Sequence, residues 1–236
     1  MVADYGAHKD VLQDLLLFWS SKEEAYTTLA AYKDRMPEDQ PYYYYACGQS
    51  VDKIAKLPQV ERILDKGYEI LYMTDDMDDF VVQLLVGYND KLLKSINSED
   101  ALPESEAEKA RAEEKTHANS FVIDFAKECL GDKVADVRIS KILKSQPVCM
   151  VADGPITLEM EKYFNRQGRG SLGYKAQRVL ELNADSSVFA ALKSAVIDDE
   201  DKAKKYVNLL YNQALLIAGL PMQDPTQFTE DICSLM

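Results

Sequence analysis

Residues 71–80 read Leu-Tyr-Met-Thr-Asp-Asp-Met-Asp-Asp-Phe, and the run continues through Val-Val-Gln-Leu-Leu at 81–85 to Tyr-Asn-Asp-Lys at 88–91. The apolar and aromatic run 68–73 predicts an internal strand. The polar residues 74–79 predict a turn that caps a following helix, because carboxylates complement the partial positive charge at a helix start. The aspartates lack the spaced ligands and central glycine of a calcium loop, so we interpret them as a solvated helix start.

The first part of the chain, up to about residue 97, alternates helix and strand patterns. This alternation predicts a small parallel sheet flanked by helices. The expected helices cover 9–19, 51–65 with a bend at Pro58, and 78–88, and the expected strands cover 42–47, 68–73 and 92–96. Trp19 falls on the apolar face of the first helix, which predicts a core position for its indole.

A second block begins where Pro103 interrupts the pattern. We therefore expect two domains: an α/β domain over 1–102 and an α+β domain over 103–236. A long, charge-rich helix is expected over 107–127. Further strands are expected over 134–139, 148–152 and 178–182, and further helices over 155–167, 187–197, 201–218 and 224–236.

Composition restricts the class of function. The 40 acidic and 27 basic side chains give a net charge of -13, which disfavours a nucleic-acid surface and favours protein partners. The cysteines, Cys47, Cys129, Cys149 and Cys233, lack the paired spacing of a zinc site or redox couple, and they indicate a reducing compartment. No signal peptide or membrane-span pattern is present, so we expect a cytoplasmic location and no membrane partner.

Two motifs that suggest chemistry are discounted. Residues 168–173 spell GxGxxG, but they follow a polar helix end, whereas a dinucleotide site needs its glycines between a strand and a helix. We interpret them as a flexible loop. His8 and His117 have no nearby serine or cysteine with an activating partner. The sequence therefore predicts no catalytic residues, no metal site and no cofactor in this chain.

Several segments besides Tyr-Met-Thr-Asp at 72–75 form an ordered set. They are 29–36, Gln40 with 42–45, 134–140, 180–183, 214–216 and 224–225. The set covers about Lys9 to Met236, and it resembles the end of the middle domain and the C-terminal domain of the 90-kilodalton heat-shock chaperones. The resemblance implies an α/β middle subdomain, followed by an α+β dimerisation domain that ends in a helical bundle.

The resemblance also implies what this chain lacks. The family's ATP site, and the arginine that acts on the nucleotide, belong to parts upstream of the segment that is similar to this chain. We therefore expect a non-enzymatic chain from an ATP-dependent stress chaperone that uses ATP and magnesium when complete. The ending Ser234-Leu235-Met236 lacks the acidic pentapeptide of eukaryotic cytosolic members, which implies a bacterial-type protein.

The predicted helix over 155–167 is the candidate for client binding. Its apolar residues recur at helical spacing, and such a stripe ordinarily packs on a core. In bacterial members of the family, however, this helix presents apolar side chains to partly folded client proteins. The residues that match are Ile156, Met160, Tyr163 and Phe164, with Asp79, Phe80 and Gln83 in the first domain. The resemblance thus implies a stripe that faces solvent.

The last two predicted helices carry apolar residues on more than one face, which exceeds what one core contact requires. A single chain could bury both helices internally, and this alternative stays open. In the family these helices pair across a two-fold axis as a four-helix bundle, which implies a homodimer. The expected interface residues are Val207, Leu210, Ala214, Ile217, Phe228, Ile232 and Leu235.

A different class of function also stays open. The first domain could be a small-molecule-binding α/β enzyme, with a site at the carboxyl ends of its strands near Cys47, Gly48 and Thr74. A metabolite bound there would favour the enzyme, whereas a two-fold helical bundle would favour the chaperone.

Overall fold

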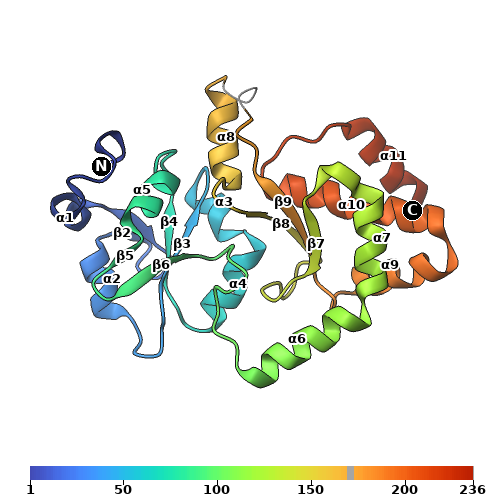
Figure 1. The fold of residues 1–236 in the computed structure, drawn as a ribbon, viewed down its shortest axis with the longest axis horizontal. Coiled ribbons are helices and arrows are strands. Elements are labelled where there is room, and N and C mark those ends of the chain that lie inside the picture. Colours follow the sequence, from blue (N-terminus) through green and yellow to red (C-terminus); the bar gives the residue numbers. More distant parts are fainter. Residues whose placement is uncertain (169–172, 236) are drawn as a thin grey trace. The chain divides into compact units, whose positions relative to one another are not determined.

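The computed structural model describes residues 1–168 and 173–235. The chain divides into two compact units, Met1–Pro103 with Glu159–Tyr174 and Glu104–Leu158 with Lys175–Met236 (Figure 1). The main division between the units follows Pro103, whereas the sequence predicted it one residue earlier, after Leu102. The segment Glu159–Tyr174 groups with the first unit, although the sequence assigned it to the second.

The first unit contains a six-stranded sheet in the order β2-β1-β4-β3-β6-β5. The strands are β1 (Phe18–Ser20), β2 (Ala25–Thr27), β3 (Tyr43–Cys47), β4 (Ile70–Met73), β5 (Gly87–Tyr88) and β6 (Lys91–Ser95). β3 runs parallel to β4 and β6, whereas β1 is antiparallel to β4. The sheet is therefore mixed, and the expectation of a parallel sheet is correct only for its centre.

The antiparallel strand β1 lies at the end of the segment 9–19, where the sequence predicted a helix. Only α1 (Lys9–Leu12) and a short 3-10 turn form there, and Trp19 lies in β1. Its ring meets that of Tyr26 edge-on, with 5.4 Å between centroids. The prediction of a helical Trp19 is wrong because a three-residue strand is too short to show its period in the sequence.

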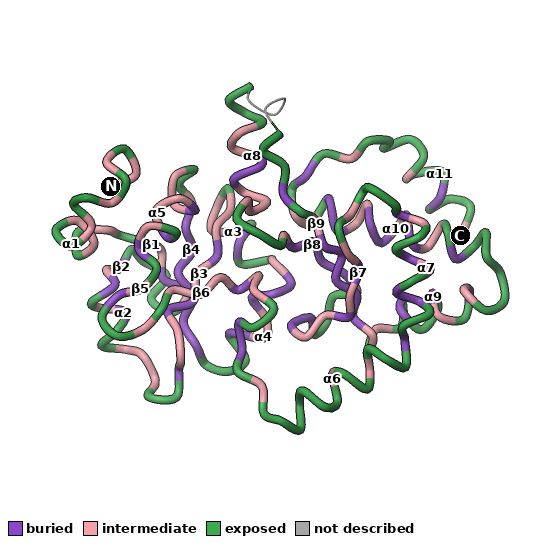
Figure 2. Tube along the Cα trace, in the orientation of Figure 1, coloured by how far each residue is buried: buried purple, intermediate pink, exposed green. Residues whose placement is uncertain are grey.

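Helices α2 (Leu29–Arg35), α3 (Val51–Ala55), α4 (Pro58–Asp65) and α5 (Asp78–Leu85) complete the N-terminal part of this unit. Pro58 begins α4 and does not bend a continuous helix, because it restricts Leu57 to an extended backbone. α5 ends before Val86, whose φ of 60° is unusual for a β-branched residue. Figure 2 shows that β3 and β4 carry much of the unit's buried surface.

The second unit contains a three-stranded sheet in the order β7-β9-β8. Its strands are β7 (Asp136–Ile139), β8 (Val148–Asp153) and β9 (Gln177–Leu182). Its helices are α6 (Glu106–Ala118), α7 (Ser120–Leu130), α9 (Ser187–Asp198), α10 (Glu200–Ile217) and α11 (Pro225–Leu235). Buried side chains of α7, α9 and α10 form one core with the sheet. No helix in the described ranges is long and apolar enough to cross a membrane.

The predicted helix over 107–127 is two helices, α6 and α7, which meet at Asn119. The Asn119 side chain donates to the carbonyl of Lys115 (2.7 Å) and accepts from the Lys193 ammonium of α9 (2.8 Å). Because these contacts hold Asn119 outside helical geometry, α6 ends at Ala118 and α7 begins after Asn119. The continuous-helix prediction is wrong because Lys193 is distant in the sequence.

Each unit also holds a buried glutamate in a similar polar arrangement. In the first unit Glu69 accepts from Ser20 (2.6 Å) and from the Arg35 guanidinium (2.6 Å). In the second, Glu181 accepts from Ser140 (2.7 Å) and from the Arg138 guanidinium (2.9 Å). Because both carboxylates are paired and hydrogen-bonded, their burial is compatible with stability.

Candidate functional site

The acidic turn before α5 is held by its own side chains. Asp75 accepts from the amide of Met77 (2.8 Å), and Asp78 accepts from the amide of Asp75 (2.9 Å). The residue that precedes α5, Met77, makes no side-chain cap. The predicted capping aspartates therefore stabilise the turn rather than the first α5 amides. Burial raises the pKa of Asp78 to about 6.

Helix α8 (Leu158–Arg166) packs against α5 within the first unit through Glu159–Arg166. Met160 is only 2% exposed, and the Gln83 side-chain amide donates to its sulfur (3.6 Å). The expectation that the whole stripe faces solvent is wrong for Met160. The reason is that α5 presents an apolar side facing this stripe, a pairing that neither helix's periodicity can reveal.

Aromatic rings surround this contact. Phe80 of α5 meets Tyr163 and Phe164 of α8 edge-on, at centroid distances of 5.5 Å and 5.9 Å. Tyr174 stacks on Phe164 at 4.3 Å. Phe80, Tyr163 and Phe164 are half-buried and Tyr174 is exposed. Tyr174 was missed by the sequence analysis, because it belongs to no periodic segment that would place it beside Phe164.

Charged groups lie at the end of the same contact. Arg166 of α8 forms an ion pair with Asp76 of the acidic turn, and both side chains are substantially exposed. Exposed pairs of this kind contribute little to stability. The arrangement of α5 and α8 is thus a shallow aromatic contact, with one buried methionine and a solvent-screened ion pair.

The other predicted client-binding residues have varied environments. Ile156 is half-buried and precedes α8, which begins at Leu158 and not at Pro155. Asp79 is buried and Gln83 is exposed. The structure therefore brings Phe80, Gln83 and Met160 together with Tyr163 and Phe164, while Ile156 lies outside the helix.

The predicted dimer residues separate into two groups. Val207, Leu210 and Ala214 are 1%, 4% and 0% exposed and belong to the second unit's own core. This seam of α10 is therefore already covered by the chain itself. Ile217, Phe228 and Leu235 are half-buried, and Ile232 is exposed. Asp224 accepts from the amide of Gln227 (2.9 Å) and so caps the start of α11.

Another face of α10 remains accessible. Leu216 is 52% exposed, and Leu209, seven residues earlier, is half-buried. They form an apolar stripe on a different side from the Val207 seam, whereas Ile217, seven residues after Leu210, lies at the edge of that seam. A heptad count in the sequence finds both stripes but cannot decide which of them the sheet covers.

The strand ends proposed for an enzyme site offer little space. A hollow of about 10 Å³ is lined there by Cys47, Gly48, Gln49, Asp75, Asp76, Asp79, Glu159 and Arg166. A metabolite site usually has several hundred cubic ångströms. Burial and the neighbouring Asp79 charge raise the pKa of the Cys47 thiol, which disfavours its nucleophilic form. These observations do not favour the enzyme alternative.

Two further predictions concern metals and phosphate binding. Within residues 1–168 and 173–235, no group of three His, Cys, Asp or Glu side chains is arranged to hold a metal ion. Most of the glycine-rich run 168–173 lies outside the described residues, so its predicted loop stays a prediction.

Comparisons with known proteins cover nearly the whole chain. The family model described as "Hsp90 protein" matches residues 2–236. Three curated relatives named "Chaperone protein HtpG" match 99% of the chain, from Bacillus velezensis (51% identical), Bacillus subtilis (49%) and Clostridium botulinum (48%). The chain spans 37% of the length of each of these relatives. The matches confirm the resemblance carried by the ordered segments.

Proposed function

The chain belongs to the Hsp90 protein family, and on this premise we propose that it binds partly folded client proteins through the α5–α8 surface. We define this surface as Phe80, Gln83, Met160, Tyr163, Phe164 and Tyr174. The observation that carries the proposal is the cluster of half-buried rings around Phe80. Methionine and aromatic side chains adapt to varied apolar shapes, which suits binding of many sequences.

The shallow packing suggests how a client gains access. In the described arrangement α5 and α8 cover part of each other's apolar side chains, so a client competes with this internal contact. The internal contact is limited in depth, because Phe80, Tyr163 and Phe164 all keep exposed area. A client segment therefore binds at the ring edges first, and displacing α8 then exposes Met160.

Fluorescence anisotropy with a labelled, permanently unfolded protein tests this proposal. The double variant Phe80→Ser with Phe164→Ser is expected to bind it about 30-fold more weakly, because aromatic side chains at the centre of an interface contribute about 1 kcal/mol or more each. Leu64→Ser with Leu92→Ser is the matched control, since both leucines are exposed in the same unit away from this surface. Equal losses of affinity in the two double variants would refute the assignment of client binding to the α5–α8 surface.

We also propose that the chain forms a homodimer through α10 and α11, with Leu209 and Leu216 of α10 in place of the buried Val207, Leu210 and Ala214. The proposed interface is Leu209, Leu216, Ile217, Phe228, Ile232 and Leu235. The support is the exposure of Leu216 and Ile232, which a self-complementary two-fold contact would bury. Val207, Leu210 and Ala214 pack in the core of the second unit and so hold α10 in place.

Light scattering at micromolar concentration tests the dimer. The unmodified chain is expected to have twice the mass of one chain, and Leu216→Glu with Ile232→Glu is expected to have the mass of one. Val188→Glu with Leu64→Glu places the same charges at exposed apolar positions elsewhere and is expected to remain dimeric. A monomeric unmodified chain would refute the proposal.

For the complete protein, we propose an ATP-dependent chaperone of the bacterial cytoplasm in which ATP and magnesium bind outside this chain. This chain itself is then non-enzymatic. Calorimetry with magnesium and ATP on the purified chain is expected to show no saturable binding, and saturable binding would contradict this division of roles.

A further inference from the structure

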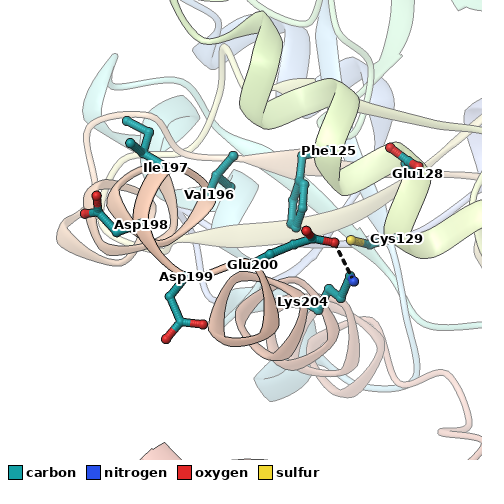
Figure 3. Close-up of a pocket in the computed structure, with 9 residues that line it drawn as sticks. All are labelled: Phe125, Glu128, Cys129, Val196, Ile197, Asp198, Asp199, Glu200 and Lys204. Carbon is teal, nitrogen blue, oxygen red and sulfur yellow. Dashed lines mark ion pairs between the residues drawn. The ribbon is translucent and has the colours of Figure 1, made fainter.

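A second hollow lies in the second unit, where α7, the end of α9 and the start of α10 meet (Figure 3). Its volume is about 710 Å³, within the range of pockets that hold ligands. We call it the α7–α10 pocket, and its lining is Phe125, Glu128, Cys129, Val196, Ile197, Asp198, Asp199, Glu200 and Lys204. None of these residues belongs to the α5–α8 surface or to the proposed dimer interface.

The pocket has an apolar part. Phe125 and Val196 are partly buried against the core of the unit, so their positions are set by packing. Ile197, the residue after Val196 in α9, is 70% exposed. Figure 3 shows the Phe125 ring pointing from α7 toward Glu200 of α10. The pocket therefore offers apolar side chains on both α7 and α9.

The pocket is also strongly negative. Its lining has four carboxylates and one ammonium group, a formal charge of -3. Glu200 is paired with Lys204 (2.6 Å), and Asp199 accepts from the amide of Lys202 (3.1 Å) as the cap of α10. The side-chain carboxylates of Glu128 and Asp198 have no hydrogen-bond or ion-pair partner among the described residues. Two carboxylates are therefore available to a cationic ligand beside an apolar wall.

We infer that the α7–α10 pocket binds a basic amphipathic peptide segment of a partner protein. An aliphatic or aromatic side chain of that segment packs on Ile197, Val196 and Phe125. Its arginine or lysine side chains pair with Glu128 and Asp198. Acidic peptides are excluded by the pocket's charge, and purely polar basic peptides lack the apolar contact. This inference goes beyond the proposed client binding and does not rest on it.

The available chemistry favours this occupant over a metal ion. The described residues contain no cluster of three ligating side chains, and Glu200 and Asp199 are already engaged. A peptide can use two separated carboxylates, because arginine and lysine side chains are long and flexible. Exposed ion pairs contribute little singly, so the charged and apolar contacts are both needed for measurable affinity.

Anisotropy titration of the whole chain with a short labelled peptide of alternating arginine and leucine tests the inference. The double variant Glu128→Gln with Asp198→Asn is expected to bind about tenfold more weakly. Its fold is expected to be unchanged, because neither carboxylate holds a structural contact. Ile197→Ser is expected to weaken binding by a similar factor, through loss of the apolar contact.

Glu113→Gln with Glu114→Gln on α6 is the matched control, since it removes the same charge at exposed positions outside the pocket. This control is expected to bind like the unmodified chain. Peptides with glutamate replacing arginine, or with glycine replacing leucine, are expected not to bind. The inference is overturned if the unmodified chain does not bind the first peptide, if both double variants weaken equally, or if the pocket variants bind normally.

Discussion

The apolar stripe of α8 and the Val207 seam of α10 have similar sequence periodicity but are buried to different extents. Met160 is buried, whereas Tyr163 and Phe164 on the same helix stay half-exposed against Phe80. Val207, Leu210 and Ala214 are all nearly inaccessible within the second unit's core. Spacing alone therefore does not distinguish a shallow contact between helices from a buried core.

The difference between the two regions lies in side-chain size and in what covers each helix. Valine, leucine and alanine allow α10 to approach the sheet closely, and α7 and α9 share its core. The bulky rings of α8 meet Phe80 at their edges, which leaves part of each ring in water. We therefore expect the α10 seam to leave its core only when the second unit unfolds. Helix α8 is expected to detach from α5 by local opening, while the rest of the first unit stays folded.

The largest effect is expected from placing a charge in the α10 seam. Leu210→Glu should destabilise the second unit by about 4 kcal/mol or more, because it removes a packed side chain and buries an unpaired carboxylate. Circular dichroism should show loss of helix. Fluorescence of Trp19, the chain's one tryptophan, should be unchanged because it lies in the first unit.

The exposed stripe of the same helix provides the control for this prediction. Leu216→Glu should leave both signals intact, since Leu216 is 52% exposed. If Leu210→Glu keeps its helix content and changes only the molar mass, then the seam is an intermolecular interface and the comparison fails.

A smaller effect is expected from Met160→Ala. Removing this buried side chain should cost about 2–3 kcal/mol of α8 packing. Hydrogen exchange of the α8 amides should accelerate about 30-fold or more, while β3 and β4 amides keep their protection. Leu64→Ala, at an exposed position of α4, is the control. Global destabilisation of the first unit would instead show that α8 is part of its core.

The acidic turn beside this contact predicts a pH dependence. Folding raises the pKa of Asp78 from 3.8 to about 6, so the folded state binds a proton more tightly than the unfolded state between these values. The stability of the first unit should therefore fall as pH rises through this window. Asp78→Asn keeps an acceptor for the Asp75 amide and removes the ionisation.

Urea unfolding followed by Trp19 fluorescence measures the effect of Asp78. The variant and the unmodified chain should have similar stability below pH about 4, and the variant should be more stable above pH about 6. Parallel stability curves for the two proteins across this range would contradict the role given to Asp78.

The smallest effect is expected from the ion pair between α8 and the acidic turn. Arg166→Ala should loosen α8 by no more than about 1 kcal/mol, because both partners are exposed. The difference should shrink as salt is raised, which hydrogen exchange at two salt concentrations measures. An effect as large as that of Met160→Ala would mean that charge, not apolar packing, holds α8.

Regular segments were predicted well where a strong local pattern exists. The expected strands over 42–47, 68–73, 148–152 and 178–182 correspond to β3, β4, β8 and β9. These strands are rich in apolar residues and are bounded by turn residues. The predictions over 9–19 and 107–127 failed, because β1 pairs with distant β4 and Asn119 is held by distant Lys193.

The candidate site was predicted in its residues but not in its arrangement. Phe80, Gln83, Met160, Tyr163 and Phe164 were named from the resemblance, and the structure brings them together. Tyr174 was missed, and so was the α7–α10 pocket. Its lining comes from three helices, and no local spacing relates Phe125 to Ile197 or Glu200.

The sequence by itself determined the family, the main strands and the existence of apolar stripes on α8 and α10. These properties depend on residue order and on local periodicity. Only the tertiary structure decided that Met160 packs beside Gln83, and that Val207 faces the core while Leu216 faces outward. The physical reason is that a helical period shows that an apolar face exists, whereas the surface that covers it is supplied by residues far away in the chain.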